Sequence, residues 1–181
     1  MRCALLAAVS LPFVFTALPL HAADLSDLTW TTTDDQVTIT ACDRGAAGEL
    51  VIPDTIEGNA VTSIGNRAFR GCDSLPSIAI PEGVTSIGDI AFHSCTGLTS
   101  ITIPDGLTSI GEGAFYKCTS LTSITIPDSV TSIGMITFLE CANLTSITIP
   151  DSVTSIGDYA FLSCTSLTSI TIPDSVTSIG E

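Results

Sequence analysis

Cysteine is the reactive side chain that recurs most regularly in this sequence. Five cysteines follow one another at intervals of 23 residues, and two more, Cys3 and Cys42, lie nearer the N-terminus. The five are Cys72, Cys95, Cys118, Cys141 and Cys164. Thiols can form disulfides or bind zinc. Even spacing along a repeat argues against zinc, because the four ligands of a zinc ion must converge on one point.

We interpret the five evenly spaced cysteines as buried packing residues. Stacked in neighbouring repeats, they would have Cα atoms about 5 Å apart, but parallel Cβ directions fit disulfide geometry poorly. A buried thiol behaves as a small hydrophobe. Cys42 lies outside the regular series, and its pairing with Cys72 remains open.

No catalytic site is predicted. His93 is the only histidine after the N-terminal segment, so a Ser-His-Asp or Cys-His site would depend on it alone. Gly-x-Ser-x-Gly, a phosphate-binding glycine loop and a histidine metal pair are all absent from the sequence. An acidic residue recurs in successive turns. We interpret these acids as residues that favour the turn conformation and not as a calcium site. They are Glu82, Asp105, Asp128, Asp151 and Asp174. We therefore expect no enzyme activity, no metal site and no cofactor.

Threonine is the residue type best placed to carry binding. It recurs at two positions in the segment Leu-Thr-Ser-Ile-Thr-Ile, where side chains of a strand alternate between faces. We predict an exposed recognition face made of Thr99, Thr102, Thr122, Thr125, Thr145, Thr148, Thr168 and Thr171. Two alternatives stay open: a solvated face that reflects β-propensity alone, and an ice-binding threonine array.

All these residues belong to a 23-residue repeat. Residues 130–152 and 153–175 are identical at 17 positions, and the frame extends over residues 61–181 as five complete units and a partial sixth. Such a period predicts a solenoid. In each unit, Leu-Thr-Ser-Ile-Thr-Ile predicts a strand with leucine and both isoleucines inward, closed by proline. Val-Thr-Ser-Ile predicts a second extended piece, glycine ends it, and the seven residues that follow predict one or two helical turns.

The first 60 residues differ from the repeat. Residues 1–22 combine a basic start, an apolar run and a small-residue cleavage site after Ala22, which predicts a secretory signal peptide. An uncleaved anchor is the alternative. Residues 23–60 predict an N-terminal cap, in which strands at 36–42 and 49–53 pair as a β-hairpin with Trp30 packed on it. We interpret residues 55–59 as an insertion in the first turn. For Trp30, the alternative to a packing role is that it forms a platform for a ligand.

The chain is strongly acidic. It has 19 Asp and Glu residues against five Lys and Arg, a formal net charge of −14. Removal of Arg2 with a leader leaves four basic residues against 19 acidic ones, or −15. Such a surface repels nucleic-acid phosphates and anionic membranes. No second apolar stretch of spanning length follows the leader, so we expect no membrane insertion after its cleavage.

The repeat resembles the BspA-like class of leucine-rich repeats, found largely in bacterial surface and secreted proteins. The matching residues are Leu-xx-Ile-x-Ile-Pro followed by Val-Thr-Ser-Ile-Gly-xx-Ala-Phe-xx-Cys-xx-Leu, over residues 51–181. The resemblance implies a right-handed, β-rich leucine-rich-repeat solenoid with a parallel sheet on one face and a hairpin-like start. It also implies non-catalytic adhesion or protein binding at the cell exterior, and it brings no binding residues with it.

We therefore expect a secreted, periplasmic or surface protein that binds an extracellular protein or a cell-surface glycan. A structural spacer with no ligand of its own is the alternative. The repeat frame stops at Glu181 with Val176 and Ile179 as a partial layer and no polar cap. Either the chain is a truncated form of a longer protein, or this open end self-associates with a second copy.

Overall fold

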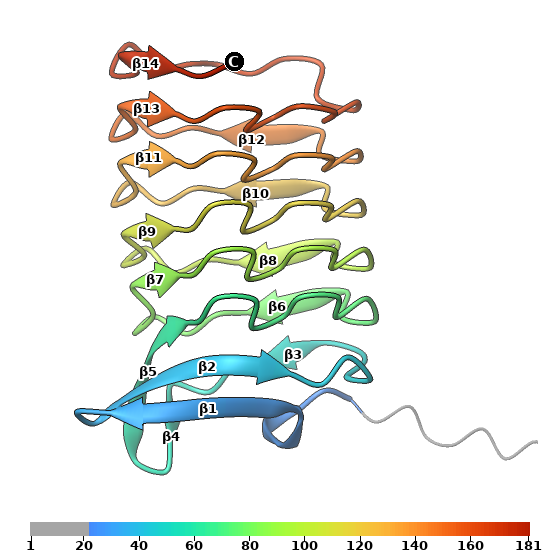
Figure 1. Cartoon of the computed structure of the whole chain (residues 1–181), viewed down its shortest axis with the longest axis vertical. Coiled ribbons are helices and arrows are strands. Elements are labelled where there is room, and N and C mark those ends of the chain that lie inside the picture. The colour runs from blue at the N-terminus through green and yellow to red at the C-terminus, as the bar shows by residue number, and fades with distance from the viewer. Residues whose placement is uncertain (1–21) are drawn as a thin grey trace, which may run out of the picture.

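The chain forms a solenoid of flat coils stacked on an N-terminal cap (Figure 1). This computed structural model describes residues 22–181, so the predicted signal peptide lies outside the described part except for Ala22. Each coil contributes two short strands and a run of turns, and equivalent residues of successive coils lie in register. The predicted solenoid class is confirmed.

Two parallel sheets run along the stack on opposite sides. The first contains β3 (Leu50–Val51), β6 (Ser77–Ala79), β8 (Ser100–Thr102), β10 (Ser123–Thr125) and β12 (Ser146–Thr148). The second contains β5 (Asn59–Ile64), β7 (Ser86–Ile87), β9 (Ser109–Ile110), β11 (Ser132–Ile133), β13 (Ser155–Ile156) and β14 (Ser178–Ile179). Partners differ by one repeat, as in Ser77 with Ser100 and Ile64 with Ile87.

Both sheets are interrupted at the same level of the stack. Pairing stops between β8 and β10 on one side and between β9 and β11 on the other, and we call this boundary the seam. The coils that meet there carry Leu107 where most coils have valine and Thr137 where the others have alanine, and both side chains are fully buried. Both residues add volume to close-packed columns at the level where the pairing stops.

The third side of each coil consists of tandem turns, which differs from the predicted helical turns. His93 N donates to Ile90 O at 3.2 Å and Cys95 N to Phe92 O at 3.1 Å, while Phe92 N donates to Ala114 O of the next coil at 2.8 Å. Ile90 and Ser94 accordingly adopt positive φ values of 57° and 59°. A helix would rise 1.5 Å per residue and leave the layer of about 4.8 Å that each coil occupies.

Columns of identical apolar side chains fill the interior. Phe69, Phe92, Phe115 and Phe138 are fully buried, and Phe161 packs against them. Successive rings are stacked with centroids 5.1, 5.3, 5.5 and 5.5 Å apart. Leucine and isoleucine columns bury the inner faces of both sheets, as predicted. No single coil could close such a core, so its stability comes from the stacking of neighbours.

The glycine after most short strands is required by close approach between coils, and Gly134 at the seam is the exception, since a Cβ there would lie 3.6 Å from Glu112 Cα of the preceding coil. A Cβ built on Gly111 would lie 2.5 Å from both Asp89 N and Gly88 C of the preceding coil, and one on Gly157 would lie 2.6 Å from Met135 N. Neither glycine has a positive φ. Close approach, and not a positive φ, therefore explains glycine at these two positions.

The cap contains a hairpin, but not the predicted one. After a short 3-10 turn, η1 (Leu25–Asp27), strand β1 (Leu28–Thr33) pairs antiparallel with β2 (Gln36–Cys42). The strand at 36–42 is confirmed and its pairing with residues 49–53 is wrong, because β3 instead pairs parallel with β6. Residues 50–51 already occupy the main-strand position of the first coil. Trp30 lies half-buried against the core, as predicted.

The predicted insertion forms a second small hairpin. Strand β4 (Thr55–Ile56) pairs antiparallel with β5 across a turn at Glu57 and Gly58, whose φ values are 53° and 84°. Two consecutive positive φ values are those of a type I′ hairpin turn. β2 pairs parallel with β5, so the cap continues directly into the second sheet.

Replacing Gly111 with alanine should destabilise the fold by about 1–3 kcal/mol, because the added methyl group has no room against the preceding coil. Gly106 is the matched control, since a Cβ there would meet Glu82 O at an ordinary 3.6 Å. Chemical denaturation of both variants measures the difference. Equal stabilities of Gly111→Ala and Gly106→Ala would show that the close approach does not limit this position.

Candidate functional site

The predicted threonine face lies on the first sheet and the segments that flank it. All eight threonines are exposed, and their role in recognition stays a prediction. In the first column, Oγ1 of Thr99, Thr122 and Thr145 donates to the backbone one coil below, at 2.8, 3.3 and 3.0 Å. In the second column, Thr102, Thr125 and Thr148 make no hydrogen bond to another described side chain or backbone group through their hydroxyls. The second column, together with Thr168 at the top of the first, therefore offers unoccupied hydroxyls to a partner.

The seam makes a groove in this face. It has a volume of about 260 Å³ and lies between β8 and β10, where Thr102 and Thr125 form its polar rim. Ile101 and Ile103 are only half-buried there, whereas the equivalent Ile124 and Ile126 in the next coil are buried. A second groove of about 280 Å³ crosses β3, β6 and β8. The repeat pattern alone could not show the seam groove, because it arises from a missing strand pairing.

A polar and aromatic row crosses the turn side, and the sequence analysis missed it. Arg70, His93 and Tyr116 occupy the same position of three successive coils. Arg70 Nε donates to His93 Nδ1 at 3.2 Å, and the rings of His93 and Tyr116 have centroids 4.7 Å apart. Tyr116 Oη donates to Glu140 Oε1 at 3.3 Å. The 23-residue spacing of these three residues was the signal that could have revealed the row.

Basic side chains gather beside this row. Lys117 Nζ lies 5.1 Å from the centre of the Tyr116 ring and 3.8 Å from Glu140 Oε2. Arg67 and Arg70 line a groove of about 220 Å³ together with Ile90 and His93. Arg44, the remaining basic residue of the described chain, lies against Gly71 on the same side. An otherwise acidic chain thus concentrates its cations on the lower turn side, where they can contact a carboxylate of a partner.

His93 is held in its neutral form. Burial lowers the pKa of His93, and the nearby charges of Arg70 and Lys117 lower it further. Since Nδ1 accepts from Arg70, Nε2 carries the proton and faces Ser94 Oγ at 3.3 Å. This fits a residue that links two coils, and no described group beside it completes a Ser-His-Asp or Cys-His site.

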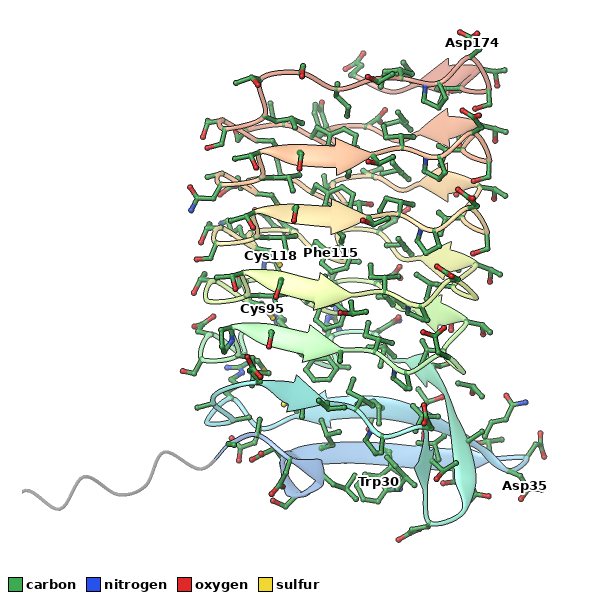
Figure 2. All side chains as sticks on the ribbon, turned by 180° about the vertical axis from the view of Figure 1, so that it is seen from behind. Trp30, Asp35, Cys95, Phe115, Cys118 and Asp174 are labelled. Atoms are coloured by element: carbon green, nitrogen blue, oxygen red, sulfur yellow. The ribbon has the colours of Figure 1, made fainter. Side chains whose placement is uncertain are left out.

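The cysteine column is buried, as the sequence predicted for its five members. Each sulfur above the first donates to the carbonyl of a phenylalanine in the coil below, as Cys95 does to Phe69 at 2.9 Å and Cys118 to Phe92 at 3.1 Å. Figure 2 shows Cys95 and Cys118 in successive coils. Burial raises the pKa of Cys95 and of Cys141 to about 12, so both are protonated and poorly nucleophilic at neutral pH.

The five acids of the turn series, from Glu82 to Asp174, are all exposed. Within residues 22–181, no three His, Cys, Asp or Glu side chains gather as a metal-binding group.

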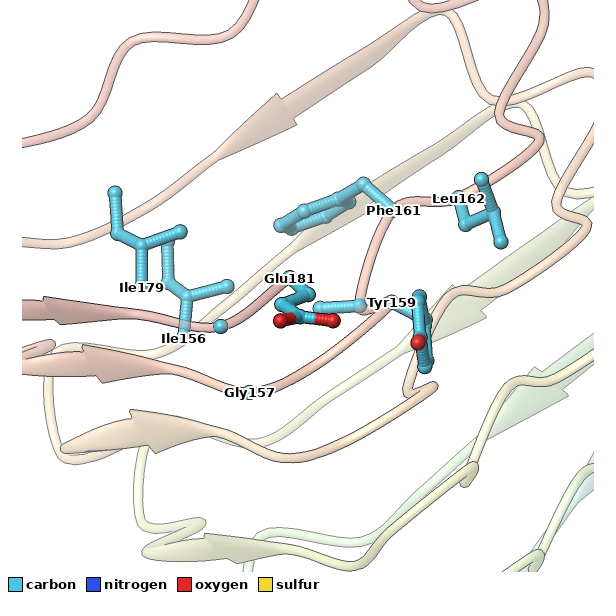
Figure 3. Close-up of a pocket in the computed structure, with 9 residues that line it drawn as sticks. Ile156, Gly157, Tyr159, Phe161, Leu162, Ile179 and Glu181 are labelled. Atoms are coloured by element: carbon cyan, nitrogen blue, oxygen red, sulfur yellow. The ribbon is translucent and has the colours of Figure 1, made fainter.

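The upper end of the stack has an apolar cavity of about 370 Å³, which is lined by Tyr159, Phe161, Leu162 and Ile179 (Figure 3). Self-association through this end remains a prediction. None of the helices found in residues 22–181 has the length and hydrophobicity to cross a membrane.

The repeat of this solenoid matches a known protein family. A model of the BspA type leucine rich repeat region matches residues 54–181 in six copies. The chain belongs to the BspA-type leucine-rich repeat family. No curated protein matches it.

Solved structures of bacterial leucine-rich repeat proteins share the fold. A leucine-rich repeat protein of T. pallidum is 32% identical with a TM-score of 0.78, over 88% of this chain and 82% of that one. A leucine rich cell surface protein of Faecalibacterium prausnitzii is 35% identical with a TM-score of 0.63, over 85% and 49%. One from Bacteroides ovatus is 32% identical with a TM-score of 0.54, over 86% and 36%. This BspA-type chain thus spans about half or less of the latter two proteins.

The pKa of His93 should lie below 6.5, and Arg70→Gln should raise it by removing one of the two repelling cations. NMR titration of the ring protons measures both values. Arg44→Gln is the matched control, because Arg44 does not perturb His93. Below pH 6.5, His93 binds a proton more readily in the unfolded chain than in the folded chain. The free energy of unfolding should therefore fall as the pH drops through this range. An unshifted His93 would contradict the described contacts.

The buried thiols should make the fold sensitive to alkali. Their ordinary pKa is 9.0 and burial raises that of Cys95 and Cys141 to about 12, so the unfolded chain loses thiol protons first. The free energy of unfolding should therefore fall as the pH rises from 9 towards 12. Denaturation at several pH values measures this slope, and Cys141→Ala should make it shallower. A variant with the same slope would show that other groups cause the loss.

Proposed function

We propose that this BspA-type protein is a non-catalytic binding protein at the bacterial exterior, and that it recognises an extracellular protein or surface glycan through the threonine face. The observation that carries the proposal is the row of free hydroxyls on Thr102, Thr125 and Thr148 beside the seam groove. Family membership and the cell-surface description of the F. prausnitzii protein support the location. Repeat solenoids commonly use such extended faces for binding.

The threonine face suits recognition in physical terms. Thr125 and Thr148 lie opposite each other in the paired strands β10 and β12, where hydroxyls repeat at about 4.8 Å, and Thr102 lies across the seam groove, so an extended partner can meet all three. Each hydroxyl both donates and accepts, which suits peptide groups and sugar hydroxyls equally. Threonine side chains on a sheet are stiff at χ1, and ordering them on binding therefore costs little entropy. The half-buried Ile101 and Ile103 add apolar surface at the centre.

The turn side offers a second candidate surface for the same function. Arg70, His93, Tyr116 and Lys117 form one connected row there, and aromatic and arginine side chains dominate many binding sites. The spacer alternative predicts that neither surface binds. An ice-binding array would require a long, even threonine column, but Ala79 takes the corresponding position in β6.

A binding screen with face-specific variants tests the proposal. The folded chain is screened against extracellular proteins and glycans, and each hit is remeasured with Thr125→Lys, which places a long charged side chain beside the seam groove. Affinity should fall about tenfold or more, since a misplaced charge at an interface centre costs at least about 1.4 kcal/mol.

Matched controls separate the surfaces. Thr131→Lys changes an equally exposed threonine near the other sheet and should leave binding within about twofold. Tyr116→Ala tests the turn side. If Thr125→Lys binds like the unmodified chain while Tyr116→Ala does not, recognition lies on the turn side. If no ligand binds above background at any face, the spacer alternative replaces the proposal.

A further inference from the structure

Two cysteines meet where the cap joins the first coil. Cys42 is the last residue of β2, with 9% of its surface exposed, and Cys72 is fully buried. The Cys42 sulfur lies 3.6 Å from Asp43 O, and the Cys72 sulfur lies 3.9 Å from the same oxygen. The two thiols are also joined by a hydrogen bond between their side chains, so they are direct neighbours although the residues are 30 apart in sequence.

Cys42 occupies the position that phenylalanine holds in every later coil. Phe69 N donates to Ala91 O of the next coil at 2.8 Å, and Cys42 N donates to Ala68 O in the same way at 2.7 Å. The cysteine contact repeats too, because the Cys95 sulfur points to Phe69 O and the Cys72 sulfur to Cys42 O at 3.8 Å. At this one junction, a thiol therefore replaces an aromatic ring beside the cysteine column.

We propose that Cys42 and Cys72 form a disulfide that fastens the N-terminal cap to the first coil. The co-reactant is a carrier disulfide, such as oxidised glutathione or an oxidised dithiol protein. One carrier sulfur bonds to Cys42, the more exposed thiol, and the other leaves as a thiol. The Cys72 thiolate then attacks the Cys42 sulfur and releases the second carrier thiol. Two protein thiols are oxidised, one carrier disulfide is reduced, and the protein's two protons pass to the carrier thiols.

The surroundings of the pair favour the second step, in which the Cys72 thiolate attacks the Cys42 sulfur. The hydrogen bond from Cys42 and the charge of Arg44 lower the pKa of Cys72, while the same bond and burial raise that of Cys42. Cys72 is thus the thiol that ionises more readily and completes the exchange. Arg44 stays close to it, since its Nε lies 3.7 Å from the Cβ position at Gly71.

The other cysteines lack this arrangement. From Cys95 upward, the residue below each thiol is a phenylalanine, and stacked cysteines of neighbouring coils have parallel Cβ directions that suit a disulfide poorly. The proposal therefore assigns one cross-link and leaves four thiols reduced. Its role follows from the fold: terminal coils of a solenoid have a neighbour on one side only and open first.

Thiol mapping of the full chain tests the assignment. The protein is folded, incubated with oxidised glutathione, denatured without reductant, alkylated and digested. We expect a peptide pair that joins Cys42 to Cys72, with alkyl groups on Cys95, Cys118, Cys141 and Cys164. Alkylation of both Cys42 and Cys72, or a cross-link within the regular column, would overturn the proposal.

The melting temperature gives a second, independent readout. Reduction should lower it by about 5–10 °C in the unmodified chain, because a loop of this length loses its closure constraint. Cys42→Ala should melt at the same temperature with and without reductant, while Cys118→Ala should keep the difference. No response to reductant in the unmodified chain would contradict a stabilising cross-link.

Discussion

The whole structure depends on the close, in-register approach of one coil to the next. Parallel strands require a spacing of about 4.8 Å, and every other contact has to fit within it. Away from the seam, glycine follows the short strands because a Cβ would collide with the coil below. Phenylalanine rings stack within 5.5 Å because they repeat at the same spacing. The tandem turns exist for the same reason, since they remain in one layer and direct alternate N–H groups to the next coil.

This constraint separates the residues that build the fold from those that can serve a partner. Inward columns and the cysteine thiols are used in packing and in hydrogen bonds between coils. Three of the eight threonines of the predicted face are also used, because the hydroxyls of Thr99, Thr122 and Thr145 bind the backbone of the preceding coil. What remains free is a narrow set: the second threonine column, the seam groove and the row from Arg70 to Glu140. The surfaces open to a partner are thus departures from the repeat and residues that the stack leaves unused.

The departures also explain where the solenoid is irregular. Leu107 and Thr137 enlarge two buried columns at one level, and both sheets lose their pairing there while the turn side stays hydrogen-bonded, as in Phe115 N to Thr137 O at 3.0 Å. The break in pairing is therefore confined to the strands, which have few residues per coil. At the lower end, Cys42 replaces an aromatic residue and gives the junction with the cap a chemistry that no other coil has.

The sequence by itself determined the repeat, its period, the inward columns, the exposed threonines and the family. Each of these follows from identical residues at a fixed spacing, because identical units have identical environments when they stack. Only the tertiary structure decided the features that depend on neighbouring coils: the hairpin partner of β2, the turns in place of helices, the seam, and the contacts of His93 and of Cys42. A local pattern shows which face a side chain takes, but hydrogen bonds between coils and the volume between them are properties of the stack.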